Sequence, residues 1–268
     1  MSLQEKKLFL LDMDGTLYLD DNLFDGVLDF LAAVKARGGR YLFLTNNSSK
    51  GVEDYVKKLR RLGIEAEQED FLTSVHATVH TLKKEFPHAV CYVAGTASFR
   101  RQLTDAGIVV RDTLSDDITL LLSGFDTELT FQKLEDSCIL LNRVNRGVTW
   151  LATNPDWVCP TAYGYVPDCG SVCQMLTKAT GKTPRFIGKP RPDMVHLALE
   201  KTGFAPSEAV LVGDRLYTDI ACGVNAGIDT VFVLSGEGTE ADIAEMNIQP
   251  TWVMEDVAEL YRKMEEST

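Results

Sequence analysis

Two aspartates, Asp12 and Asp14, directly follow the apolar run Leu8–Leu11 near the start of the chain. If the run is a strand, residues two positions apart point to the same side, so the two carboxylates are expected near one point. Carboxylates this close repel each other unless a cation lies between them or one of them keeps a proton. The pattern therefore predicts a site that binds a metal ion or transfers protons.

Three more polar segments follow predicted strands: Thr45–Ser48, Gly188–Pro190 and Gly213–Asp219. In open parallel sheets, ligands bind beyond the carboxyl ends of the strands, so a sheet would bring all four segments together. Taken singly, each segment has an ordinary alternative, such as a helix N-cap or a surface turn. Four such segments in this order, each at a predicted strand end, favour one shared site.

The aspartates, threonine and lysine of these segments are suited to phosphoryl transfer. Asp12 can attack phosphorus and form an aspartyl-phosphate that water later cleaves. Asp14 can give a proton to the leaving oxygen and later take one from the water. Asp12 and Asp214, with a backbone carbonyl, offer the oxygen ligands that Mg²⁺ prefers.

The remaining polar residues are expected to bind and neutralise the phosphate. Thr45 offers a hydroxyl and an N–H, and Asn46 and Asn47 follow where a helix begins, with free N–H groups that favour an anion. Lys189 supplies a positive charge to the phosphoryl oxygens. Asp219 is expected to lie behind these groups and to hold Lys189 or a metal-bound water.

Composition excludes several other classes of protein. The chain has 268 residues, 45% of them hydrophobic, which is enough for one large or two smaller domains with a normal core. Its net charge of -12 and the lack of a basic run argue against nucleic acid as a partner. No apolar run reaches the roughly 18 residues of a membrane helix, and Met1–Lys7 lacks the apolar core of a signal peptide. We therefore expect a cytoplasmic protein that does not bind a membrane.

The six cysteines include no C-x-x-C pair and are interpreted as reduced thiols. A zinc site formed by Cys159, Cys169 and Cys173 is the alternative. His76 and His80 lack the glutamate of an H-E-x-x-H motif and are interpreted as ordinary helix residues.

Strands and helices are predicted to alternate at both ends of the chain, which favours an α/β fold with a doubly wound parallel sheet. This core is expected to comprise residues 1–87 and 183–268, with a smaller α/β cap domain, 88–182, inserted between them. The expected strands are 8–11, 41–44, 71–73, 90–93, 118–123, 148–153, 186–187, 209–212 and 230–234. The expected helices are 27–37, 52–62, one that ends near 86, 97–106, 130–143, 171–179, 193–202 and 220–226.

With these motifs in hand, the chain resembles the haloacid dehalogenase (HAD) superfamily of phosphohydrolases, and within it the NagD-like, p-nitrophenylphosphatase-type branch. The resemblance rests on LDMDGT, LTNNS, GKP and GDRLYTDI, which match the four motifs of that branch, and on the loop that begins ATNPD. It covers nearly the whole chain, and no motif position departs from the pattern.

The resemblance implies a role for each motif residue. Asp12 would be the nucleophile, Asp14 the acid/base, and Thr45 and Lys189 ligands of the phosphate. Mg²⁺ would be held by Asp12, the backbone carbonyl of Asp14, and Asp214. The implied activity is Mg²⁺-dependent hydrolysis of a small phosphorylated metabolite, and of p-nitrophenyl phosphate, through an aspartyl-phosphate.

Two other functions use similar residues. A phosphomutase or phosphotransferase would form the same aspartyl-phosphate and differ in the acceptor. A receiver-like phosphoacceptor module shares the acidic cluster, but it is much shorter and needs no inserted domain. The expected partner is a small phosphate ester, and the expected assembly is a monomer or homodimer.

The loop 154–171 is expected to select the substrate, because Tyr163, Tyr165 and Asp168 could grip a polar leaving group. Asp156 is expected to share this role. A rigid surface loop with solvated tyrosines is the alternative.

Overall fold

The computed structural model describes residues 2–144, 147–161 and 163–266, and these residues form two compact units. The larger unit contains the chain up to residue 45, residues 55–72, and the chain from residue 189 onward. The smaller unit contains residues 46–54 and 73–188. Each unit is built around its own parallel sheet, as expected of an α/β protein.

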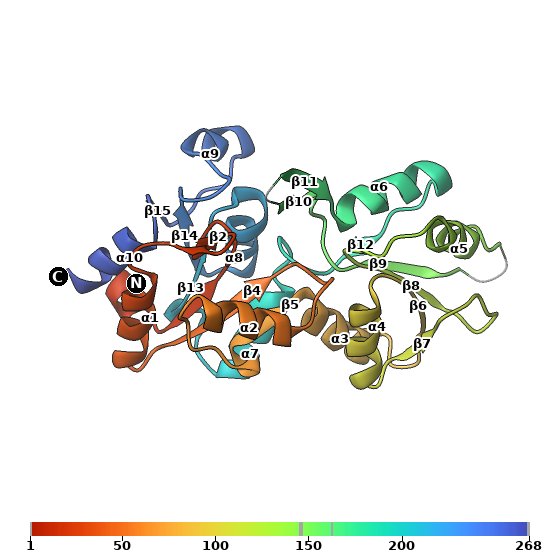
Figure 1. Ribbon diagram of the computed structural model, residues 1–268, viewed down its shortest axis with the longest axis horizontal. Coiled ribbons are helices and arrows are strands. Elements are labelled where there is room, and N and C mark those ends of the chain that lie inside the picture. Colours follow the sequence, from red (N-terminus) through yellow and green to blue (C-terminus); the bar gives the residue numbers. More distant parts are fainter. Residues whose placement is uncertain (1, 145–146, 162, 267–268) are drawn as a thin grey trace. The chain divides into compact units, whose positions relative to one another are not determined.

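The sheet of the larger unit has the strand order β15-β14-β13-β1-β4-β5. Figure 1 labels all of these strands except β1. These strands are β1 (Leu8–Leu11), β4 (Arg40–Thr45), β5 (Phe71–Thr73), β13 (Ala209–Gly213), β14 (Asp229–Val233) and β15 (Trp252–Met254). The central strand β1 is buried along its whole length and pairs in parallel with β13 on one side and β4 on the other. The order therefore reverses at β1, and such a reversal is where open α/β sheets bind ligands.

Six helices belong largely or wholly to the larger unit: α1 (Val27–Ala36), α2 (Val52–Arg61), α7 (Asp193–Thr202), α8 (Ala221–Ala226), α9 (Glu240–Met246) and α10 (Val257–Glu265). Helices α1 and α10 pack together, and Arg37 Nη2 donates a hydrogen bond of 2.6 Å to the carbonyl of Met264. Helix α10 begins at Asp256, whose side chain accepts a hydrogen bond from the amide of Glu259. Because α10 follows β15 in the chain, this contact joins the last elements to the first helix.

The smaller unit has a five-stranded sheet with the order β12-β9-β8-β6-β7, in which every neighbouring pair is parallel. Its strands are β6 (Val90–Ala94), β7 (Val109–Arg111), β8 (Leu120–Ser123), β9 (Thr149–Ala152) and β12 (Arg185–Phe186). Its helices are α3 (Ser74–Glu85), α4 (Ala97–Asp105), α5 (Phe131–Leu141) and α6 (Cys169–Thr180). A buried cluster that includes Tyr92, Leu121, Leu140 and Trp150 forms its core.

Residues 46–54 are bound to the smaller unit by hydrogen bonds to distant parts of the chain. Ser48 Oγ lies 3.0 Å from Thr153 Oγ1 and accepts a hydrogen bond of 2.9 Å from the amide of Phe125. Thr96 Oγ1 donates to the carbonyl of Ser49. The chain thus enters the smaller unit twice, first for residues 46–54, directly after Thr45, and again for residues 73–188.

The prediction of an α/β fold with a parallel sheet is confirmed, and most of the predicted elements are present within a few residues. The predicted strand near Phe186 is present, but it pairs with β9 in the sheet of the smaller unit. The prediction missed the hairpin β2 (Tyr18–Leu19) with β3 (Asn22–Leu23), and the hairpin β10 (Val158–Thr161) with β11 (Gly164–Pro167). It also missed β7, α9, β15 and α10. In the part of the chain that the structure describes, no helix combines the length and apolar character needed to cross a bilayer.

The central strand gives a test of the fold. Leu10 lies in the middle of β1 and is fully buried, so Leu10→Ala should lower the free energy of unfolding by about 2–5 kcal/mol through lost burial and a residual cavity. Leu19→Ala is the control, because Leu19 is 54% exposed and should cost less than ~1 kcal/mol. Urea unfolding followed by circular dichroism measures both. Equal losses would contradict the place of β1 in the core.

Candidate active site

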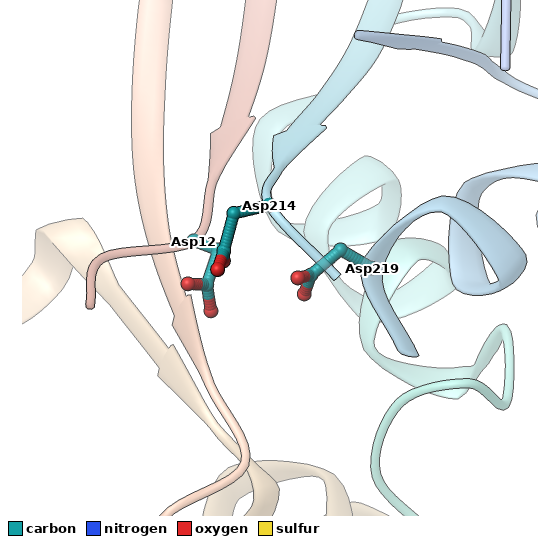
Figure 2. Close-up of side chains that lie close together, drawn as sticks. All are labelled: Asp12, Asp214 and Asp219. Atoms are coloured by element: carbon teal, nitrogen blue, oxygen red, sulfur yellow. The ribbon is translucent and has the colours of Figure 1, made fainter. Parts of the chain in front are cut away.

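The strand ends β1 and β13 place two aspartates side by side. Leu11 is the last paired residue of β1 and lies opposite Val212, and the amide of Asp12 donates a hydrogen bond of 2.9 Å to the Val212 carbonyl. Asp12 and Asp214 therefore leave neighbouring strands at the same level. Asp219 comes from the short π-helical turn Leu216–Ile220 that follows β13. Figure 2 shows the three carboxylates converging, and one oxygen from each lies within 4.8 Å of the others.

Lys189 lies between two of these carboxylates. Its Nζ is 2.6 Å from Asp12 Oδ1 and 2.6 Å from Asp219 Oδ1, and the residue is only 3% exposed. Burial alone would lower the pKa of Lys189, but the charges of Asp12 and Asp219 outweigh it and raise the pKa. The ammonium group therefore stays charged at the bottom of the site.

Asp214 is held by the backbone and by close packing. The amide of Glu237 donates a hydrogen bond of 2.8 Å to Asp214 Oδ2, and Thr16 Oγ1 donates one of 3.3 Å to Oδ1. Two glycines make room for it: a Cβ on Gly15 or Gly236 would come within 2.4 or 2.0 Å of Asp214 Oδ2. Gly15 also has φ +87°, a backbone conformation that side chains disfavour.

The crowded acids hold protons more tightly than free aspartates. Burial, with the charges of Asp12 and Asp219, raises the pKa of Asp214 to about 7. Burial and the charge of Asp12 also raise the pKa of Asp219 to about 6, although Lys189 opposes the shift. A divalent cation would remove this repulsion, and an all-carboxylate donor set suits a hard ion such as Mg²⁺. Among the described residues, Asp12, Asp214 and Asp219 are the group of acidic, histidine or cysteine side chains that converges in this way.

Asp14 lies in a different environment from Asp12. Its side chain is half exposed; Lys58 Nζ lies 3.3 Å from Oδ1, and Tyr18 Oη donates to Oδ2 at 3.4 Å. Desolvation of the Asp14 carboxyl group by the surrounding protein raises its pKa, the charge of Lys58 lowers the pKa, and the charge of Asp12 adds to the rise. An acid with a raised pKa and an exposed carboxyl group is suited to exchanging protons with a substrate.

The segment after β4 carries the predicted phosphate ligands. Thr45 is the buried last residue of β4, two positions beyond Phe43, which lies opposite Leu11. Thr45 thus lies at the same edge of the sheet as Asp12 and Asp214. Asn46 and Asn47 follow it and belong to the smaller unit, where Asn46 Nδ2 donates to Asp156 Oδ2 at 2.9 Å. Of the predicted site residues, the larger unit therefore brings together Asp12, Asp14, Thr45, Lys189, Asp214 and Asp219.

The loop 154–171 divides into buried acids and exposed tyrosines. Asp156 and Asp168 are each 5% exposed, and Asn154 Nδ2 donates a hydrogen bond to both. Asp168 also caps the start of α6. Tyr163 and Tyr165 are 83% and 63% exposed, whereas Ala162 lies outside the described residues. Solvent therefore reaches the tyrosines of this loop, while the carboxylates that were expected to contact a substrate support the loop from inside.

Sequence reasoning missed Lys58 and Tyr18. Lys58 is one of two adjacent lysines on a helix rich in charged residues, and nothing local distinguishes it from Lys57. Tyr18 forms part of the missed hairpin β2–β3, whose two-residue strands carry too little periodicity to detect. The one available signal was the short distance along the chain from Asp14 to Tyr18.

Comparison with known proteins identifies a family for both ends of the chain. The family described as haloacid dehalogenase-like hydrolase matches residues 9–109, and a second family pattern, described as HAD-hydrolase-like, matches residues 186–260. Together these matches include every motif residue of the site.

Individual relatives cover almost the entire chain. An acid sugar phosphatase of Staphylococcus aureus (strain MRSA252) is 34% identical over 98% of this chain and 100% of its own. The crystal structure of a 4-nitrophenylphosphatase from Thermotoga maritima has a TM-score of 0.91 and 38% identity, covering 98% of this chain and 99% of its own. A glycerol phosphate phosphatase from Mycobacterium tuberculosis, solved in complex with magnesium, has a TM-score of 0.89 and 29% identity, covering 98% and 78%.

The raised pKa of Asp214 predicts how stability depends on pH without metal. Between about pH 4 and about pH 7 the folded protein keeps a proton on Asp214 that the unfolded chain releases, so this group destabilises the fold increasingly as pH rises. Asp214→Asn removes the effect. In EDTA, the free energy of unfolding of Asp214→Asn relative to the wild type should therefore be higher at about pH 8 than at about pH 5. Urea titrations at both pH values test this, and an unchanged difference would contradict it.

Proposed function

Since the chain belongs to the haloacid dehalogenase-like hydrolase family and is a phosphatase of that type, we propose that it hydrolyses small phosphorylated metabolites, and p-nitrophenyl phosphate, through a phosphorylated Asp12. The observation that carries this proposal is the buried Lys189, which holds Asp12 at the end of β1 while Asp14 lies apart with its own partners. Two aspartates in different environments can perform two different steps.

In the first step, a carboxylate oxygen of Asp12 attacks phosphorus and the bond from phosphorus to the ester oxygen breaks. Asp14 gives its proton to that oxygen, so the alcohol leaves neutral. In the second step, Asp14 takes a proton from water, which attacks the aspartyl-phosphate and releases inorganic phosphate. Lys189 and Thr45 stabilise the charge on the phosphoryl oxygens, and the amides of Asn46 and Asn47 bind the same group.

Asp12, Asp214 and the backbone carbonyl of Asp14 would hold Mg²⁺ in this proposal. The donor set fits, because carboxylate oxygens are hard ligands and the acidic side chains of Asp12, Asp214 and Asp219 converge. The ion, when bound, would supply the positive charge that lets the carboxylate of Asp12 approach a phosphate dianion. The magnesium complex of the M. tuberculosis phosphatase supports the choice of metal.

The names of the relatives, an acid sugar phosphatase and a glycerol phosphate phosphatase, favour a polyol or sugar phosphate as substrate. We assign the role of cap to the predicted domain 88–182, which lies within the smaller unit, and leaving-group binding to Tyr163 and Tyr165 of its loop. A cytoplasmic location and a monomeric or homodimeric state stay predictions.

One alternative uses the same residues. A phosphomutase or phosphotransferase would pass the phosphoryl group from Asp12 to a second alcohol instead of water. Release of inorganic phosphate, measured against transfer to an added sugar or polyol, separates the two. The receiver-like module is excluded by membership of a hydrolase family.

Loss of the nucleophile gives the first test. Asp12→Asn should reduce Mg²⁺-dependent turnover of p-nitrophenyl phosphate by at least ~10³-fold, because an amide is a poor nucleophile and a weaker metal ligand. Asp29→Asn, at an exposed position of the same unit, is the matched control and should retain full activity. Activity of Asp12→Asn within tenfold of the wild type would remove Asp12 from the nucleophilic role.

Asp14→Asn should act differently, because it keeps the nucleophile and removes the proton donor. The fall in kcat should be larger for an alkyl phosphate such as glycerol phosphate than for p-nitrophenyl phosphate, whose leaving group departs as a stable anion. Steady-state kinetics of both substrates provide the comparison. Equal losses would mean that Asp14 acts through folding or metal binding.

A further inference from the structure

Lys58 is the charged side chain nearest to Asp14 that the proposed mechanism does not use. It lies on α2, and its Nζ is 3.3 Å from Asp14 Oδ1. The same ammonium group lies over the ring of Tyr18, 3.9 Å from the ring centroid. Its side chain is 25% exposed, so it is partly withdrawn from solvent. A lysine held by both a carboxylate and an aromatic face has less freedom than an ordinary surface lysine.

Tyr18 contacts the other side of the same carboxyl group. It is fully buried, and its hydroxyl donates to Asp14 Oδ2 at 3.4 Å. Its backbone is fixed too, since Asp14 and Tyr18 form a β-bridge and the amide of Gly15 donates a hydrogen bond of 2.8 Å to the Tyr18 carbonyl. Each carboxylate oxygen of Asp14 thus has its own partner, Lys58 for Oδ1 and Tyr18 for Oδ2.

These contacts matter because the Asp14 side chain is 51% exposed. An aspartate this exposed would sample several rotamers without partners, whereas proton transfer requires one fixed distance and direction to the leaving oxygen. An isolated surface ion pair would be too weak to fix it. Here the ring of Tyr18 holds the ammonium group in place, so the ion pair and the hydrogen bond act together.

We propose that Lys58 is a positioning residue for Asp14. Held over the ring of Tyr18, the ammonium group of Lys58 keeps the Asp14 carboxyl group in the orientation that delivers a proton to the leaving oxygen. The inference rests on the proposed role of Asp14 as acid/base. Lys58 acts through Asp14 and touches neither the phosphoryl group nor the leaving group. In this arrangement each aspartate has its own lysine: Lys189 holds Asp12 and Lys58 holds Asp14.

The test compares Lys58→Met with Lys57→Met. Methionine keeps an unbranched apolar stem and removes the charge, and Lys57 is the exposed neighbour on the same helix. For glycerol phosphate, Lys58→Met should lower kcat by about tenfold with KM unchanged within about twofold, and p-nitrophenyl phosphate should lose clearly less. Lys57→Met should match the wild type on both substrates. Lys58→Arg, which keeps a cation that can stack on Tyr18, should retain more kcat on glycerol phosphate than Lys58→Met.

A double variant separates positioning from a general structural effect. If Lys58 acts through Asp14, adding Lys58→Met to Asp14→Asn should cost less than about twofold more kcat on glycerol phosphate. A further loss equal to that of Lys58→Met alone would overturn the inference. A rise in KM with kcat unchanged would also overturn it, because Lys58 would then bind substrate.

Failure of the inference is distinguishable from failure of the proposed function. If the wild type releases phosphate and Asp14→Asn shows the predicted dependence on the leaving group, while Lys58→Met matches the wild type, only the role of Lys58 is wrong. If Asp14→Asn shows no such dependence, the acid/base role of Asp14 and the role of Lys58 fall together, whereas hydrolysis through Asp12 is tested separately by Asp12→Asn. Thermal melting of each variant, expected within a few degrees of the wild type, shows that the kinetic losses come from folded protein.

Discussion

The contact of one buried ammonium group with two carboxylates determines how this site is built. Lys189 is almost completely withdrawn from solvent, and without Asp12 and Asp219 its charge would be very costly to bury. In turn, the ammonium group of Lys189 offsets part of the repulsion among Asp12, Asp214 and Asp219. The parallel pairing of β1 with β13 and the turn after β13 bring the acids together, and Lys189 makes their proximity tolerable. Burial raises the pKa of Asp214, and the neighbouring charges of Asp12 and Asp219 add to the rise.

The environments of Asp12 and Asp14 make two chemically identical side chains suited to different roles. Asp12 is bound to the buried ammonium group of Lys189 at the end of the central strand, which fixes the position of its carboxyl group. Asp14 reaches toward solvent, and its partners are a partly exposed lysine and a phenol. A fixed anion suits attack on phosphorus, and an accessible acid suits proton exchange with the leaving group and water.

The sequence correctly predicted the elements whose local residue pattern matches their place in the tertiary structure. Strand β1 is apolar throughout because both of its faces are buried. Polar residues follow directly at its end, which is where open α/β sheets bind ligands. The last elements, α9, β15 and α10, were missed although α10 packs against α1, since contacts so distant along the chain leave little local signal. Lys58 was missed for the same reason: its partners, Asp14 and Tyr18, lie on a different element. Sequence alone does not reveal that the loop carboxylate of Asp156 is buried and accepts hydrogen bonds from Asn46 and Asn154.

The chain crosses between the two units after residues 45, 54, 72 and 188. These crossings limit how the smaller unit can be exchanged between related proteins. The smaller unit is not one continuous cassette, because residues 46–54 belong to it and Ser48 binds Thr153 and Phe125 there. A chimera that replaced only the long second stretch would combine one protein's Ser48 with another protein's loop. Families that diversify by recombining domains would therefore have to change both stretches together. The segment that directly follows Thr45 would be inherited with the smaller unit rather than with the larger one.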